Sequence, residues 1–400
     1  MNDNKRDNKL ILNPVENLPH LVSNYTTSEL EGFYISDKVR TAEQKKKTNI
    51  LFSGREQYSI LINEIYLKWA KLLNADALSM RLLSGLHAHI VTFMGVGNIG
   101  DSVLLLPTEA GGHYATSTIL KRLGYRVIDM VVDYKNFCVD KKETQLLIRN
   151  LKPKFIFVDR SEGINYEDFS ELTNNNSCCI YDASQYLTNI MMGTYKTPFD
   201  MGFDFLLSTL HKNFPGPQQA LICAKDKNNI YWQRILSGMS SYVSNLHADN
   251  IFKAGAAIRN MELLHKYASL ALENSVALEK NLIDVGLKVI QKKDNLPPTH
   301  HIWIPLKDQN CALKAQQRLE EHNLLVNYRL LPYNLGYGLR LGTTAATLQG
   351  LTPDKTHILA KLIVDIIKEE PRIKSQHVCD FINSLVPLNK NIIEEPMDNT

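Results

Sequence analysis

The sequence predicts an α/β protein with a mostly parallel sheet and a smaller α+β unit after it. Six apolar, strand-like runs occupy residues 103–106, 126–131, 155–158, 178–181, 203–207 and 220–223. Helical stretches such as 115–123 and 143–151 lie between several of them. Strands that alternate with helices favour a parallel sheet covered on both faces. A chain of 400 residues also favours one large and one smaller domain over a single core.

We expect four segments along the chain. Residues 1–55 are polar and irregular, and we interpret them as an N-terminal arm that wraps another surface. A large domain follows over 56–255, and apolar residues at helical spacing from Tyr58 to Leu72 predict its first helix. Residues 250–275 predict one long helix leading into a small C-terminal domain, 256–390. Residues 391–400 are expected to be a frayed tail.

Composition excludes several classes of protein. The net charge is only +3 and no basic stripe runs through a domain, so nucleic acid is not an expected partner. The sequence contains no run of 18 apolar residues, so no membrane span is expected. Its polar start lacks the apolar core of a signal peptide. The six cysteines form no CxxC pair, which argues against a zinc site and a disulfide framework. We therefore expect a cytoplasmic protein with reduced thiols and no metal.

A lysine at the end of a strand is the first candidate for chemistry. Residues 208–218 read STLHKNFPGPQ, in which His211 and Lys212 follow a strand and precede a rigid Pro-Gly-Pro turn. Ligands of open α/β sheets bind at the carboxyl ends of strands. A lysine held there is suited to forming a Schiff base, whereas a lone lysine elsewhere is usually a surface residue.

Three other positions complete a possible cofactor site. Asp182 also ends an apolar strand and could pair with a protonated pyridine nitrogen, although alone it would be interpreted as a helix cap. Ser84 and Gly85 begin a helical stretch and could bind a phosphate through free N–H groups. His113, after two glycines, could stack on the face of a flat ligand.

In this order, these motifs resemble the serine hydroxymethyltransferase family of fold-type-I pyridoxal-phosphate (PLP) enzymes. The resemblance extends from about Leu12 to Leu351 and begins with an opening motif, LNPVEN, at residues 12–17. It implies a seven-stranded-type sheet in a large PLP-binding domain. It assigns the Schiff base to Lys212, the pyridinium partner to Asp182, ring stacking to His113 and the phosphate to Ser84 and Gly85.

The resemblance implies further roles outside the cofactor ring. It places Ser161 near the cofactor's phenolic oxygen, and the motif GLRLGT at 338–343 assigns the substrate carboxylate to Arg340. The segment ELEG at 29–32 assigns a catalytic glutamate to Glu31. The family's active sites are shared across a dimer. We therefore predict a homodimer in which the arm carries Glu31 to the partner's site.

Several family features are missing. The family's Tyr-Tyr-Gly-Gly is replaced by LFSG at 51–54, its Asp-x-x-His ends in Gln185, and the segment from Asn327 to Arg340 is shorter than its folate-contacting loop. These losses lie on the folate side and spare the cofactor and carboxylate contacts. GGHY at 111–114 and the short loop also resemble the threonine transaldolase branch.

We therefore expect an enzyme that makes or breaks the Cα–Cβ bond of a β-hydroxy-α-amino acid without folate, as an aldolase or a transaldolase with an aldehyde. Glu31 or His211 would remove the hydroxyl proton. Three alternatives remain open: a folate-dependent hydroxymethyltransferase, another PLP reaction at Cα, and a non-catalytic PLP scaffold.

Two patterns invite a different interpretation. GVGNIG at 95–100 is a literal G-x-G-x-x-G, but a helical pattern precedes it and a strand follows, the reverse of a dinucleotide site. His87 and His89 are two residues apart and share no helix face. We interpret them as packing or surface histidines rather than metal ligands.

Overall fold

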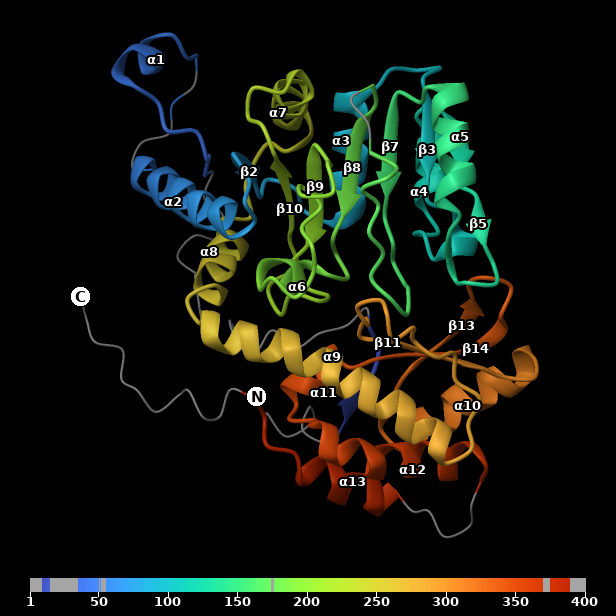
Figure 1. Ribbon diagram of the computed structural model, residues 1–400. Coiled ribbons are helices and arrows are strands. Elements are labelled where there is room, and N and C mark those ends of the chain that lie inside the picture. The colour runs from blue at the N-terminus through green and yellow to red at the C-terminus, as the bar shows by residue number, and fades with distance from the viewer. Residues whose placement is uncertain are drawn as a thin grey trace.

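The computed structural model describes residues 9–14, 35–49, 51, 55–173, 176–369 and 375–388. Figure 1 shows a large α/β unit above a smaller unit, with one long helix, α9 (Met261–Asp284), running between the two.

The centre of the large unit is a seven-stranded sheet. Its strands are β2 (Ala77–Ser79), β10 (Ala220–Ala224), β9 (Phe205–Thr209), β8 (Cys178–Asp182), β7 (Phe155–Val158), β3 (Ser102–Leu105) and β4 (Arg126–Asp129), in that spatial order. Only β10 is antiparallel to its neighbours, β2 and β9. The predicted mostly parallel seven-stranded sheet is confirmed. The short strand β2 was not predicted.

Both faces of this sheet are buried, which explains why its strands are continuous apolar runs. Every residue of β3, β7, β9 and β10 is buried. Alternate residues belong to different cores: Phe155 and Phe157 pack on one face, whereas Ile156 and Val158 pack on the other. The edge strand β4 is more exposed.

Helices cover both faces of the sheet. Those of the large unit are α2 (Glu56–Leu72), α3 (Gly85–Val96), α4 (Thr116–Arg122), α5 (Lys141–Leu151), α6 (Leu187–Met191), α7 (Ile230–Tyr242) and α8 (Ala248–Ala257), with α1 (Ala42–Lys46) before them. A two-stranded hairpin, β5 (Val132–Asp133) and β6 (Cys138–Val139), follows β4.

The single long helix predicted for 250–275 is wrong. The chain breaks it into α8 and α9, and the side chain of Asn260 accepts a 2.9 Å hydrogen bond from Leu263 N to cap the second helix. Both helices carry apolar residues at helical spacing, so periodicity alone did not reveal the break.

The smaller unit is built on a three-stranded antiparallel sheet. Its order is β11 (His301–Pro305), β14 (Gly336–Gly342) and β13 (Asn327–Leu331). α9, α10 (Gln309–Glu321), α11 (Thr344–Leu348), α12 (Thr356–Ile367) and α13 (Ser375–Asn383) pack around it. A separate pair joins β1 (Leu10–Ile11) in parallel to β12 (Leu324–Leu325).

This pairing places the start of the predicted arm in the core of its own chain. Leu10 and Leu12 are fully buried in the cluster that fills the smaller unit. The rest of the predicted arm that bears on catalysis, including Glu31, lies outside the described residues. The domain boundary at 255/256 stays a prediction.

The two units meet at the carboxyl ends of the parallel strands. In Figure 1 the arrows of β7 and β8 point toward β11, β13 and β14. Tyr333, in the β13–β14 turn, donates its N–H to Glu109 O (2.7 Å), and Arg160, just after β7, donates to the Tyr333 hydroxyl (2.7 Å). A site at this junction is therefore built by both units.

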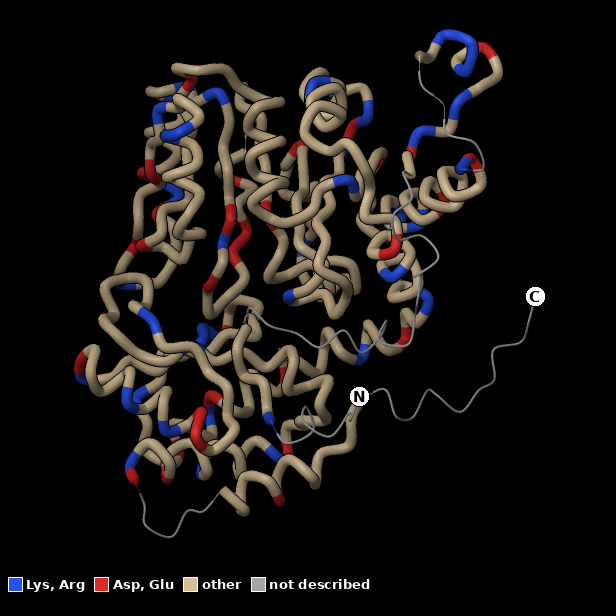
Figure 2. The backbone as a smooth tube through the Cα atoms, turned by 180° about the vertical axis from the view of Figure 1, so that it is seen from behind, with Lys and Arg blue, Asp and Glu red and all other residues tan. Residues whose placement is uncertain are grey.

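The charges of the described residues form no continuous stripe. Figure 2 shows basic and acidic positions interspersed over both units. No helix among the described residues is long and apolar enough to cross a membrane.

Candidate active site

Asp182 and Lys212 lie at the carboxyl ends of two neighbouring strands. β8 and β9 are parallel, Asp182 is paired with Leu207, and Lys212 comes three residues after Thr209, the last residue of β9. Burial lowers the pKa of the Lys212 ammonium, and the Asp182 carboxylate opposes that effect. The structure thus brings together the two residues on which the predicted site depends.

The loop that carries Lys212 is fixed by its neighbours. Leu210 N donates to Gln219 O (2.9 Å), which closes the loop at its base. Asn213 is buried, and its carbonyl accepts a 2.7 Å hydrogen bond from the Tyr267 hydroxyl on α9. Because the next residue is held in this way, the backbone of Lys212 has little freedom.

Asp182 is held in its charged form. Burial by itself would raise its pKa, but His89 Nε2 lies 2.7 Å from Oδ2 and Ser184 donates to Oδ1 from its N–H (2.8 Å) and hydroxyl (2.5 Å). Together with the positive charge of Lys212, these contacts bring the pKa of Asp182 to about 2. The carboxylate is therefore ionised at neutral pH, as a partner of a pyridinium must be.

Sequence reasoning missed the role of His89. The structure buries it on α3 as the partner of Asp182, whereas the ring of His87 accepts a 3.2 Å hydrogen bond from Leu83 N. The sequence signal for this role was that His89 lies four residues after Gly85, because residues four apart lie on the same face of a helix. Among the described residues no cluster of histidine, cysteine and carboxylate side chains could hold a metal.

Ser84 and Gly85 begin α3 beside the end of β9. The Ser84 hydroxyl accepts from His87 N (3.2 Å), and a Cβ on Gly85 would lie 2.9 Å from the side chain of Thr209. The N–H groups of the first helical turn therefore lie next to the strand that leads to Lys212, as a phosphate site requires.

The glycines before His113 lie where a larger side chain would collide with the chain's own backbone. Gly111 has a φ of +86°, and a Cβ there would lie 2.1 Å from Glu162 O. A Cβ on Gly112 would lie 2.2 Å from Leu106 O. The glycines thus allow this loop to pack against the chain's own backbone, and not only against a ligand. The packing places His113 with its ring centre 6.2 Å from that of His89.

His113 is neutral at physiological pH. Burial, reinforced by the nearby His89 and Lys212 side chains, lowers its pKa to about 4. A neutral imidazole can stack on a flat ring without adding a charge to it. His211, next to Lys212, behaves similarly, since burial and the Lys212 charge lower its pKa to about 4.

Arg340 enters the junction from β14. It is buried, its Nη2 donates to Asn327 Oδ1 (3.0 Å), and its Nη1 lies 3.6 Å from Glu162 Oε1. Burial lowers its pKa to about 10, which leaves it charged at neutral pH. Its charge also lowers the pKa of Lys212.

The other residues named from the sequence are Ser161, Gln185 and Glu31. Ser161 is half-buried on the loop after β7, between Arg160 and Glu162. Gln185 is buried and its Oε1 pairs with His300 Nε2 (3.1 Å). Glu31 lies outside the described residues.

The chain is similar to known proteins over most of its length. A family model described as serine hydroxymethyltransferase matches residues 68–363. The chain belongs to this family. The serine hydroxymethyltransferase of Pyrobaculum calidifontis is 25% identical over 383 residues, covering 91% of this chain and 89% of the relative. That of Aeropyrum pernix is 26% identical over 377 residues, covering 90% and 85%.

A solved structure from the same fold is also similar. It is the L-threonine transaldolase from Pseudomonas fluorescens in its internal aldimine state, with a TM-score of 0.86, 22% identity, and coverage of 96% of this chain and 89% of the other. The predicted fold type I is confirmed, and the family membership makes this chain a PLP-dependent transferase or aldolase.

The residues at the junction fit PLP. An ionised Asp182, a lysine on a rigid loop and the N-terminus of α3 lie at adjoining strand ends. In addition, Thr209 Oγ1 and Arg340 Nε are buried without a hydrogen-bond partner among the described residues. Unpaired buried polar groups are costly, so their presence here is consistent with a site shaped for a polar ligand.

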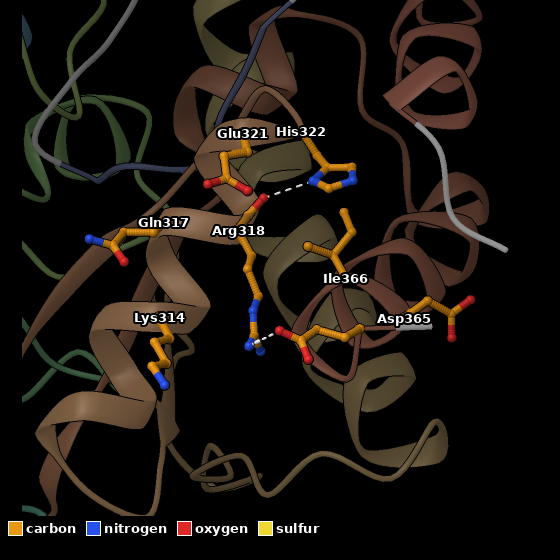
Figure 3. A pocket seen from close by; sticks show the side chains of 8 residues that line it. Lys314, Gln317, Arg318, Glu321, His322, Asp365 and Ile366 are labelled. Atoms are coloured by element: carbon orange, nitrogen blue, oxygen red, sulfur yellow. Dashed lines mark hydrogen bonds and ion pairs between the residues drawn. The ribbon is translucent and has the colours of Figure 1, made fainter. Parts of the chain in front are cut away.

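A separate groove lies between two helices of the smaller unit. Figure 3 shows a charged groove between α10 and α12, whose lining includes Lys314, Arg318 and Asp365. Arg318 pairs with Glu369 there and donates to Ile367 O (2.9 Å). None of the predicted site residues lines it.

Proposed function

We propose that the enzyme makes or breaks the Cα–Cβ bond of a β-hydroxy-α-amino acid without folate, with an aldehyde as the other reactant. The observation that supports the proposal is the short β13–β14 hairpin, because its strands span the segment from Asn327 to Arg340 in which the sequence predicts a shortened folate-contacting loop.

The cofactor site is assigned to large-unit residues. Lys212 would anchor PLP, Asp182 would keep its pyridine nitrogen protonated, His113 would cover the ring, and Ser84 with Gly85 would bind the phosphate. Bound PLP supplies the electron sink that stabilises a carbanion at Cα. Ser161 is proposed to contact the cofactor near its phenolic oxygen.

Arg340 is proposed to bind the substrate α-carboxylate. Its planar fork suits bidentate binding, and Asn327 fixes one of its nitrogens at 3.0 Å. Gripping the carboxylate orients the substrate, so that the Cα–Cβ bond can stand perpendicular to the cofactor plane. The buried setting excludes water and strengthens the charge pair.

A base must remove the proton of the β-hydroxyl group. His211 is neutral because its pKa is lowered to about 4, so Nδ1 or Nε2 can accept a proton at neutral pH. Its Nδ1 has no hydrogen-bond partner among the described residues. Glu31 is the second candidate, contributed by the arm of a partner subunit in a homodimer.

Folate independence rests on the shape of the hairpin. β13 and β14 are joined by only Pro332–Leu335, and the turn residues Tyr333 and Asn334 adopt φ values of +57° and +58°. Tyr333 is tied to Glu109 and Arg160 in the large unit. The hairpin leaves no extended polar loop between Asn327 and Arg340 for a pterin.

Two changes elsewhere support the same proposal. Gln185 replaces a family histidine and is buried against His300, and Leu51 is exposed at a position where the family has a phenol. Phenols and polar loops supply hydrogen bonds to a pterin, whereas an apolar side chain suits the body of an aldehyde. Phe52 lies outside the described residues.

The experiment uses purified holoenzyme with L-threonine or L-serine and a panel of aldehydes, with and without tetrahydrofolate. We expect new β-hydroxy amino acids, identified by mass spectrometry, in the absence of folate. Serine cleavage that requires tetrahydrofolate, with no aldehyde accepted, would establish the hydroxymethyltransferase instead. Keto-acid formation would indicate another PLP reaction at Cα.

A further inference from the structure

A second arginine lies beside Arg340 on the same face of the small sheet. Arg340 is paired with Asn327, and Arg329 comes two residues further along β13. Side chains alternate across a strand, so Asn327 and Arg329 point to one face, and the hydrogen bond from Arg340 to Asn327 places Arg340 there too. This is the face turned toward the large unit, because both arginines reach Glu162.

Glu162 lies between the two guanidinium groups but is not shared equally. Its Oε1 atom is 2.5 Å from Arg329 Nη1 and 3.6 Å from Arg340 Nη1. The first distance is a charge-assisted hydrogen bond, and the second is beyond hydrogen-bond range. Arg340 Nε is buried with no partner among the described residues, so Arg340 keeps donors for another carboxylate.

The charges of the cluster leave a place for one anion. Two guanidinium groups and one carboxylate carry a net positive charge, which the α-carboxylate of an amino acid would neutralise. Glu162 is only 1% exposed on its side chain, so it cannot turn to solvent if Arg329 is removed. Arg340 would then be its remaining cationic partner, and the same guanidinium would be needed by the substrate.

We propose that Arg329 is a positioning residue that holds Glu162 away from Arg340 and so keeps Arg340 available for the substrate carboxylate. The inference rests on the part of the proposed function that assigns the α-carboxylate to Arg340. It does not depend on folate or on the aldehyde. Arg329 itself is 29% exposed on its side chain and lies at the outer edge of the cluster.

Holoenzyme is titrated with glycine, and binding is monitored by the change in visible absorption. The kcat and KM for L-threonine cleavage are measured in parallel. In Arg329→Gln, Glu162 should move toward Arg340 and pair with it. Glycine binding should then weaken about tenfold or more, which corresponds to about 1.4 kcal/mol. The KM for L-threonine should rise while kcat stays nearly unchanged. Arg329→Lys keeps a cation for Glu162 and should recover most of the affinity. Arg318→Gln, in the groove between α10 and α12, is the matched control with wild-type affinity.

The decisive variants remove the competing carboxylate. Glu162→Gln alone should bind glycine as tightly as wild type or more tightly, and Glu162→Gln with Arg329→Gln should restore the affinity that Arg329→Gln loses. If the second substitution gives no rescue, or if Glu162→Gln alone weakens glycine binding tenfold, the proposal is overturned. The Glu162→Gln result decides the question even if Arg329→Gln does not fold.

The outcomes also separate this inference from the proposed function. Wild-type enzyme that binds glycine but accepts no aldehyde contradicts the proposed reaction and leaves the role of Arg329 standing. Wild-type enzyme that turns over aldehydes, combined with failed rescue, contradicts only the role of Arg329. Wild-type enzyme that shows no response to glycine overturns both.

Discussion

Replacing Arg340 with alanine should weaken amino-acid binding without unfolding the protein. The side chain is 5% exposed, and its contacts are Asn327 Oδ1 at 3.0 Å and, at 3.6 Å, a carboxylate that already has a closer cation in Arg329. Removing Arg340 therefore leaves Glu162 paired, and no buried carboxylate loses its only counterion. The loss should fall mainly on the incoming substrate.

The magnitude follows from the kind of contact that is lost. Truncating one partner of a buried, hydrogen-bonded charge pair costs about 2–5 kcal/mol. At about 1.4 kcal/mol for each factor of ten, glycine affinity should fall roughly 30-fold to several thousand-fold. Arg340→Lys keeps the charge but loses the planar fork, so its affinity should lie between wild type and Arg340→Ala.

The assay is a glycine titration of holoenzyme followed by visible absorption, with PLP affinity measured in parallel. PLP affinity should stay close to wild type in Arg340→Ala, because the cofactor contacts come from the large unit. Arg318→Ala serves as a matched control, since it removes an arginine of the same unit that lines the groove between α10 and α12 and not the junction. Wild-type glycine affinity in Arg340→Ala would remove this residue from the substrate site and refute the reasoning.

Four further outcomes are expected. Borohydride reduction of holoenzyme should fix the cofactor on Lys212, and an adduct mapped by mass spectrometry to another lysine would contradict the site. Asp182→Asn should still bind PLP but lose Cα–Cβ cleavage. His89→Phe removes a 2.7 Å charge-assisted contact worth about 1.5–3 kcal/mol, so the pKa of Asp182 should rise by roughly one to two pH units. The acid limb of the pH–rate profile should move to higher pH with it, and an acid limb that does not move refutes this role of His89. Mixing Lys212→Ala subunits with Glu31→Gln subunits should restore activity if sites are shared across a dimer, whereas a fully active monomer in solution would exclude sharing.

The direction of the Asp182 effect follows from its depressed pKa. Its carboxylate is ionised above about pH 2 in the folded chain, whereas an unfolded carboxyl titrates near its model value of 3.8. The ionised form therefore stabilises the native state above pH 4, and that contribution is lost as the pH falls toward 2. Removing His89 raises the folded-state pKa of Asp182 and so narrows the pH range over which this stabilisation is lost.

Much of the large unit could be predicted from the sequence because its strands are buried on both faces. Such strands appear as short apolar runs, and all six predicted runs coincide with strands of the sheet. The edge strand β2 has only three residues, too few to show a period. The break between α8 and α9 escaped notice because a helix cap is a local hydrogen bond, invisible to a pattern of apolar spacing.

The sequence by itself determined the fold class, the family resemblance and the residue types able to hold PLP, since these depend on local patterns and on motif order. Only the tertiary structure decided which groups surround them. His89 meets Asp182 across 93 positions of sequence, and Glu162 meets Arg340 across a junction between two units. The physical reason is that a charge or a hydrogen bond acts through distance in space. The chain brings those atoms together only when the strands of both units are packed, so no spacing along the sequence could have shown that Glu162 lies 2.5 Å from Arg329 and 3.6 Å from Arg340.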